Sequence, residues 1–328
     1  MVQTIVINQS NIVSDGQNNK LVYSFPNSVS FPNHEIAIQS VYMYYSWVNI
    51  NGTTLNNNTF SFFWPTNEYI VPADIDNQIK VVIPDGLYEI STLNQYLQWF
   101  CIKNGYYLIS AATNANVYFM EFVVNPTEYA VQFNAYPVPT AAEAAGVYIA
   151  PVANPILGTA DFAGYADGVA TCPQLYIPNN NNFYKIFGFP NSIGNNPNNF
   201  FVIPNAVSFG DNLGANYSFL STTSPQVQPN PVVFLALSNI ENNYATPSSI
   251  IGVVSPQVGF GELIQSEPPQ FAWNKLLPGT YNSLRLSFIG TDKSQITILD
   301  PQMTITLVIR DKKDISIGDA LASATAGK

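Results

Sequence analysis

Acid–base or nucleophilic catalysis in this chain would have to use one imidazole, because His34 is the only histidine. A Ser-His-Asp or Cys-His site needs such a group to carry the proton. His34 stands in FPNHEI, at a turn that leads into an expected strand. We therefore interpret it as a capping or surface group, and we predict no catalytic residue and no enzyme.

Metal and cofactor ligands are equally sparse. A zinc site needs several Cys and His at ligand spacing, and the chain has 2 Cys and 1 His. Asp74 with Asp76, and Asp311 with Asp314, lack the Glu and Gly of a calcium loop, so we interpret them as solvated turn carboxylates. GFGE and GYADG are not followed by the Lys-Ser/Thr of a phosphate loop. No metal and no cofactor is predicted, although spatially paired carboxylates of a glycosidase stay open.

The two cysteines are too few for a disulfide scaffold. Cys101 lies in the apolar stretch LQWFCIKNG, and Cys172 lies in GVATCPQL. We expect both to be reduced thiols, with a disulfide between them as the open alternative.

Composition and charge exclude some partners. The net charge is −10, and 11 Lys and Arg are spread over 328 residues, whereas a phosphate-binding surface needs clustered cations. Direct nucleic-acid binding is therefore not expected. Charged residues make up 10% of the chain, against roughly 25% in ordinary soluble domains, which suits a protein that buries surface against other subunits. We expect no membrane span and no signal peptide in MVQTIVINQS.

Strand patterns dominate the chain, and they indicate an antiparallel β-sandwich. One helix is expected over 91–103, with Ser91 as its cap and Gly105 at its end. The segment 136–182 is rich in Pro, Ala, Gly and Asn and is expected to be a long loop. The aromatic content of 13% is interpreted as core and subunit interface, with sugar-stacking platforms as the alternative. Strands are expected at 4–7, 20–25, 34–47, 58–64, 78–83, 116–124, 128–135, 200–203, 232–237, 248–254, 283–289 and 295–310.

The strand at 34–47 is apolar on both sets of alternating positions, which predicts that both its faces are covered. Among sandwiches, the jelly roll closes by pairing early strands with late ones. We therefore expect 295–310 to lie beside strands from the first sixty residues. The fold class predicted is all-β: a single jelly-roll domain over 1–310 with one short helix and long loops, followed by a flexible tail over 311–328.

Several stretches, in order, resemble the penton (minor capsid) proteins of virophages and polinton-like viruses, in the lineage of double-jelly-roll DNA viruses. The sharpest part is ILDP followed by alternating Ile and Thr. The resemblance spans about residues 34–310. The stretches are HEIAIQSVYMYYSWVNI, IPDGLYEISTLNQYL, FYKIFGFP, NKLLPGTYNSLRLSFI and ITILDPQMTITLVIR.

This resemblance implies a structural protein that forms homopentamers at the icosahedral fivefold vertices of a DNA virus capsid, assembled inside the host cell. Its implied partners are copies of itself and the double-jelly-roll major capsid protein, with an internal cement protein as a further candidate. The tail over 311–328 is expected to become ordered against neighbouring subunits. Two alternatives stay open: a glycan-binding attachment protein or fibre head, and a minor capsid protein away from the vertex.

Overall fold

The computed structural model describes residues 2–64, 78–151, 172–178, 181–189, 200–203, 216–228 and 230–312. The chain divides into two compact units, instead of the single domain expected over 1–310. Unit 1 comprises Met1–Val48 and Pro229–Lys328, and unit 2 comprises Asn49–Gln228. The expected tail over 311–328 falls outside the described residues, apart from Asp311 and Lys312.

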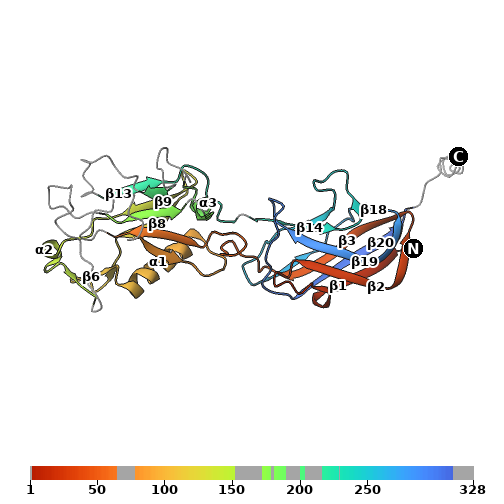
Figure 1. Ribbon diagram of the computed structural model, residues 1–328, viewed down its shortest axis with the longest axis horizontal. Coiled ribbons are helices and arrows are strands. Elements are labelled where there is room, and N and C mark those ends of the chain that lie inside the picture. The colour runs from red at the N-terminus through yellow and green to blue at the C-terminus, as the bar shows by residue number, and fades with distance from the viewer. Residues whose placement is uncertain are drawn as a thin grey trace. The chain divides into compact units, whose positions relative to one another are not determined.

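Unit 1 is built from two antiparallel sheets (Figure 1). The first has the order β1-β20-β3-β18-β15, and β17 also pairs with β3; the second has the order β16-β14-β19-β2. The strands are β1 (Val2–Asn8), β2 (Lys20–Phe31), β3 (His34–Tyr44), β14 (Val233–Leu237), β15 (Ile240–Glu241), β16 (Ile250–Val254), β17 (Leu263–Ser266), β18 (Asn274–Leu276), β19 (Gly279–Ile289) and β20 (Met303–Asp311), with the short 3-10 helix η1 (Gln9–Asn11) after β1.

The last strand lies between two of the first three. Ile5 of β1 pairs with Leu307 of β20, and Leu307 pairs with Ile38 of β3. In the second sheet, the late strand β19 likewise pairs with the early strand β2, and its other neighbour is β14. Both sheets therefore contain pairs of an early and a late strand, β1–β20 and β20–β3 in the first and β2–β19 in the second, as a jelly roll does. The predicted fold class and the predicted neighbours of the terminal strand are confirmed for unit 1.

β19 shows why the strands face as they do. Leu284, Leu286 and Phe288 are buried, and Arg285 between them is exposed. Alternating side chains point to opposite faces of a strand, so the apolar set fills the sandwich and the polar set meets water. β19 therefore has one dry face and one wet face.

β3 departs from strict alternation. Thr306 of β20 pairs with Ser40, but its neighbour Leu307 pairs with Ile38, so Gln39 stands opposite no residue. Such a bulge inserts one residue and reverses the facing of the residues after it. Ile38 points inward, because a Cβ added at Gly252 of β16 would clash with its Cδ1. The inward set is therefore Ile36, Ile38, Val41 and Met43, and the outward set includes Glu35, Ala37, Tyr42 and Tyr44.

Unit 2 has its own apolar core, which is the physical reason that it is a separate unit. The cluster joins residues from Ile50 to Phe189, all within unit 2. Aromatic rings dominate it: Phe60 stacks on Phe183 with ring centroids 5.0 Å apart, and Phe122 stacks on Phe187 at 4.2 Å. Burial of such rings is a large share of core stabilisation.

Three sheets and three helices make up the described part of unit 2. The sheets have the orders β12-β11-β4-β5, β13-β9-β8 and β10-β6-β7. The elements are β4 (Thr59–Phe63), β5 (Ile79–Val82), α1 (Ile90–Asn104), β6 (Leu108–Ser110), β7 (Asn116–Val117), β8 (Met120–Asn125), β9 (Ala130–Ala135), α2 (Ala141–Ala144), β10 (Tyr148–Ile149), β11 (Gln174–Pro178), α3 (Phe183–Phe187), β12 (Phe200–Ile203) and β13 (Tyr217–Leu220).

The helix expected over 91–103 is confirmed as α1, and Gly105 ends it in the left-handed region with φ 80°. Its cap is not Ser91. The N-cap is Glu89, whose backbone N–H donates to Thr92 Oγ1 at 2.8 Å. The long loop expected over 136–182 is wrong in part, because it contains α2, β10 and β11.

Candidate functional site

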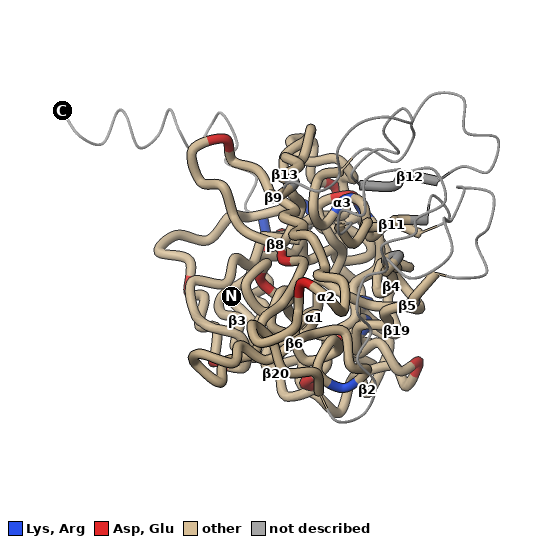
Figure 2. The backbone as a smooth tube through the Cα atoms, turned by 90° about the vertical axis from the view of Figure 1, so that its left-hand side faces the viewer, with Lys and Arg blue, Asp and Glu red and all other residues tan. Residues whose placement is uncertain are grey.

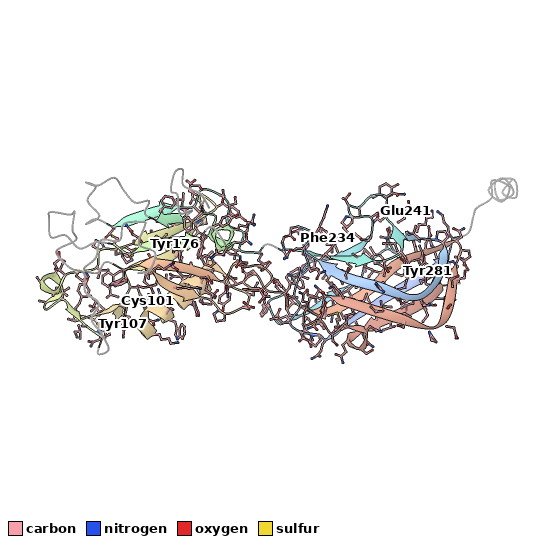
Figure 3. The ribbon with its side chains drawn as sticks, viewed as in Figure 1. Cys101, Tyr107, Tyr176, Phe234, Glu241 and Tyr281 are labelled. Carbon is pink, nitrogen blue, oxygen red and sulfur yellow. The ribbon has the colours of Figure 1, made fainter. Side chains whose placement is uncertain are left out.

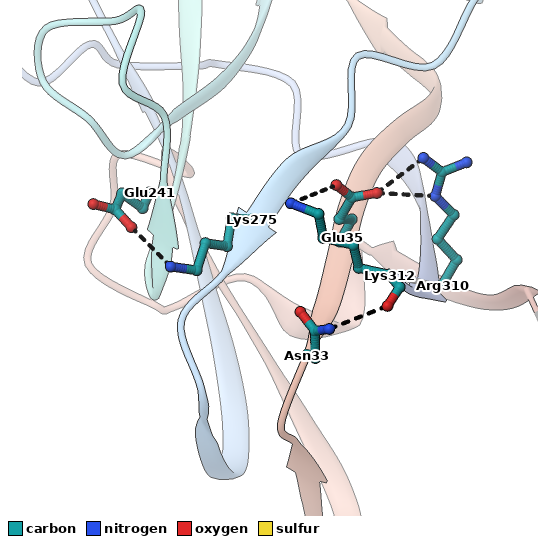
Figure 4. Close-up of polar contacts among 6 residues, drawn as sticks. All are labelled: Asn33, Glu35, Glu241, Lys275, Arg310 and Lys312. Carbon is teal, nitrogen blue, oxygen red and sulfur yellow. Dashed lines mark hydrogen bonds and ion pairs between the residues drawn. The ribbon is translucent and has the colours of Figure 1, made fainter. Parts of the chain in front are cut away.

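The outward face of the β1-β20-β3 sheet carries a row of opposite charges. Paired positions place Arg310 beside Glu35, Glu35 beside Lys275, and Lys275 beside Glu241. Positive and negative groups thus alternate across β20, β3, β18 and β15 (Figure 4). We call these four residues the charge row.

Glu35 is the centre of this row. Its Oε2 accepts hydrogen bonds from Arg310 Nε at 3.1 Å and Nη2 at 2.9 Å, and its Oε1 lies 3.9 Å from Lys312 Nζ. The Arg310 guanidinium also lies 3.9 Å above the ring of Trp273. The Glu35 side chain is only 14% exposed, so these charge-assisted bonds are stronger than those of an open surface pair. The arrangement fixes strand register and has the character of a structural support.

His34 lies next to the charge row, at the start of β3. Its Nε2 is 2.7 Å from Asp311 Oδ1, directly across the β3–β20 ladder. The imidazole packs edge-on against Phe31, with centroids 5.1 Å apart. Asp311 and His34 are both candidates from the sequence, and the structure brings their side chains into contact across the two strands.

Metal ligation finds no support in the part of the chain that the structure describes. There, no group of three or more His, Cys, Asp or Glu is placed to hold an ion. Asp74, Asp76 and Asp314 lie outside the described residues. Arg310, Lys312 and Lys275 gather around Glu35, and Figure 2 shows few basic positions along the described backbone in its view, so these cations do not form a stripe that could track phosphates.

Both cysteines are reduced thiols buried in unit 2 (Figure 3 labels Cys101). Burial raises the pKa of the Cys101 thiol to about 12 and that of Cys172 to about 12. Burial likewise raises the pKa of Tyr176 to about 12. A thiol with such a pKa carries almost no thiolate near neutral pH, so neither cysteine has the electrostatics of a nucleophile.

A cavity of about 490 Å³ lies on the same outward face of unit 1, where β1 and β3 end and β17 and β20 begin. Its lining combines two tyrosines with uncharged polar side chains. The Tyr42 hydroxyl donates to Glu267 Oε1, and this hydrogen bond raises the pKa of Tyr42. The lining residues are Asn8, Gln9, Ser10, Tyr42, Tyr44, Leu263, Gln302, Met303 and Thr304.

Sequence reasoning does not find this cavity. It expects the strand at 34–47 to be covered on both faces, and a bulge at Gln39 cannot be seen from strict alternation. The available signal is their spacing of two on a strand, which places both rings on one face.

None of the described helices is long and apolar enough to span a membrane. No family model matches this chain, and no curated protein matches it. Among solved structures, the chain is similar to a crystal structure of the mavirus penton protein, with 8% sequence identity and a TM-score of 0.36, over 95% of this chain and 99% of that one.

Proposed function

We propose that this chain is a structural capsid protein that forms homopentamers at the icosahedral fivefold vertices of a DNA virus. The observation that carries the proposal is where the resembling stretches fold. HEIAIQSVYMYYSWVNI contains β3, NKLLPGTYNSLRLSFI contains β18 and β19, and ITILDPQMTITLVIR contains β20 except for its last residue. Stretches distant in sequence thus form the central strands of one jelly roll.

The jelly roll suits a part whose function is geometric. β20 is hydrogen-bonded on both edges, to β1 and to β3, and the charge row ties β20, β3, β18 and β15 on the outer face. A fivefold ring closes only if each copy holds its neighbour at one fixed angle, so a stiff subunit is required.

The exposed edge of β1 is a surface at which copies of the chain could pair. It is an edge strand that pairs only with β20 among the described strands, and VQTIVIN contains neither charge nor proline. Val2 is 58% exposed and Val6 is 49% exposed. Edge strands in monomers are commonly guarded by charges or proline, and an unguarded edge is suited to pair with another chain.

The other partners follow from the same proposal. The rim of the pentamer contacts the double-jelly-roll major capsid protein, and an internal cement protein is a further candidate. The protein resides in the virion after assembly in the host cell. The acidic balance, with a net charge of −10, keeps the genome from being a direct partner.

The mass of the purified assembly tests the proposal. Native mass spectrometry of the full chain should give five times the chain mass of 36.0 kDa, and averaged electron micrographs should show fivefold rotational symmetry. A trimer would contradict the vertex role and favour an attachment or fibre-head protein. Capsid labelling that placed the chain away from the vertices would favour a different minor capsid role.

A further inference from the structure

We propose that the cavity on the outward face of unit 1 binds a neutral saccharide. The inference rests on the lining of the cavity and does not depend on the pentamer. A volume of about 490 Å³ falls in the range of roughly 300–1,000 Å³ that small-molecule sites occupy.

Two tyrosines provide the flat surfaces that a sugar ring needs. Tyr42 and Tyr44 are two residues apart on β3, beyond the bulge, so both belong to the outward face. Tyr42 pairs with Thr304 on one side, and Tyr44 pairs with Leu263 on the other. Both tyrosines are half-buried, and each offers an apolar ring with a polar end. Aromatic rings of this kind pack against the C–H faces of a pyranose.

The polar side chains that line the cavity can form hydrogen bonds with the hydroxyl groups of a sugar. Asn8 Oδ1 accepts from the backbone N–H of Ser10 at 2.9 Å and from its hydroxyl at 2.7 Å, which fixes the loop at one wall. The side-chain amides of Gln9 and Gln302 make no hydrogen bond to another described residue. Each amide supplies both donors and an acceptor. Such groups bind ligand hydroxyls, which also donate and accept.

Charge around the cavity selects against other ligand classes. Neither Lys nor Arg lines it, so phosphates, sulfates and nucleic acids lack a counter-charge. The nearby carboxylate of Glu267 accepts the hydrogen bond from the Tyr42 hydroxyl and thereby holds that side chain in place. A neutral polyhydroxyl compound is the class that the lining fits best.

Saturation-transfer NMR and calorimetry on the full chain test the proposal. The probes are methyl glycosides of glucose, galactose, mannose and N-acetylglucosamine, together with their disaccharides. At least one should bind at millimolar concentration. Tyr44→Ala should then weaken binding on the order of tenfold or more, through loss of a ring contact. Tyr44→Phe should retain most of the affinity, because it keeps the ring.

Tyr244→Ala is the matched control, since Tyr244 is a fully exposed tyrosine of unit 1 outside the cavity. It should bind like the unchanged chain. Failure of every saccharide to bind would overturn the proposal, as would equal binding by Tyr44→Ala with an unchanged melting temperature. Binding of choline in place of the sugars would assign the two rings to a cation site and would also overturn it.

Discussion

At the scale of single residues, the buried ionisable groups of unit 2 set how its stability depends on pH. Cys101 is 1% exposed, and Cys172 is 4% exposed. Their thiols are neutral at pH 7 because burial in apolar surroundings disfavours the thiolate. The same burial that makes them unreactive makes the folded unit bind protons more tightly than the unfolded chain does.

We expect alkaline pH to destabilise unit 2. Folding raises the thiol pKa from 9.0 to about 12 for Cys101 and for Cys172. The stabilisation is therefore complete below pH 9 and is lost as pH rises toward 12. Each thiol contributes a slope of up to about 1.4 kcal/mol per pH unit in that window. Urea midpoints measured at half-unit intervals from pH 7 to 11 should be constant at first and then fall.

Alanine variants separate this effect from general charge repulsion. Cys101→Ala and Cys172→Ala each lose some stability at pH 7 through the missing side chain, but their midpoints should fall less steeply above pH 9. If the urea midpoint fell equally steeply above pH 9 in the variants and in the unchanged chain, the thiols would not be the cause of the alkaline destabilisation.

Residue roles are predictable from the sequence where residue type alone decides them. With 1 histidine and 2 cysteines, the lack of a zinc pattern needs no coordinates. The pairing of His34 with Asp311 does need them, because 276 intervening positions are bridged only by the β3–β20 ladder. The facing of Tyr42 also needs coordinates, since it depends on a bulge against a distant strand.

At the scale of elements, β19 has a clear alternation of buried and exposed residues, so the effect of a charged substitution on its buried face can be predicted. Leu286 is 1% exposed and pairs with Leu237 of β14 and Leu21 of β2. Leu286→Asp would place an unpaired carboxylate between the sheets, which costs several kcal/mol. That is comparable with the total of about 5–15 kcal/mol that holds a domain together.

We expect Leu286→Asp to prevent folding of unit 1, seen as loss of near-UV circular dichroism and of soluble yield. Arg285→Asp is the control on the same strand, because Arg285 is on the exposed face. It should change the melting temperature by only a few degrees. A soluble Leu286→Asp protein with an unchanged melting curve would mean that the inward face of β19 has been misassigned.

Elements whose signal is local are predictable, and those that depend on distant partners are not. α1 has helical spacing of Leu93 and Leu97 and a terminal Gly105, so its sequence is sufficient. β18 has three residues and exists because Asn274 pairs with Ile36 of β3. α3 in FYKIF is too short for a helical period to be read, and its buried rings are explained only by the core of unit 2.

At the scale of the whole molecule, the division into two units is the main feature that the sequence does not reveal. Unit 2 interrupts the jelly roll between β3 and β14. The strand patterns of the two units look alike, because a buried β-strand has the same alternation in either. The junctions near Val48 and Gln228 lie in the turn-rich stretches NINGTTLNN and SPQVQPNP, but similar stretches separate strands throughout this chain, so they do not single out a boundary between two cores.

In each unit, a hydrogen bond joins residues close to the points at which the chain enters and leaves that unit. In unit 1, Trp47 Nε1 donates to the Asn230 carbonyl at 3.0 Å. In unit 2, Asn49 Nδ2 donates to the Val227 carbonyl at 2.5 Å. Each unit therefore brings together the two points at which the chain enters and leaves it, which is the usual condition for a tolerated insertion.

We expect each unit to fold when separated. Unit 2 can be expressed as Asn49–Gln228, and unit 1 can be closed by a short Gly/Ser linker between Val48 and Pro229. Each should unfold in one cooperative transition, because each has its own core. Calorimetry, near-UV circular dichroism and native mass spectrometry check this.

The separated units also test which unit joins the copies. If the β1 edge does so, unit 1 alone should assemble with the same number of subunits as the intact chain, and unit 2 should be monomeric. If unit 2 assembled and unit 1 were monomeric, the subunit contacts would belong to unit 2 and not to β1. If unit 1 failed to fold, the jelly roll would need its insertion.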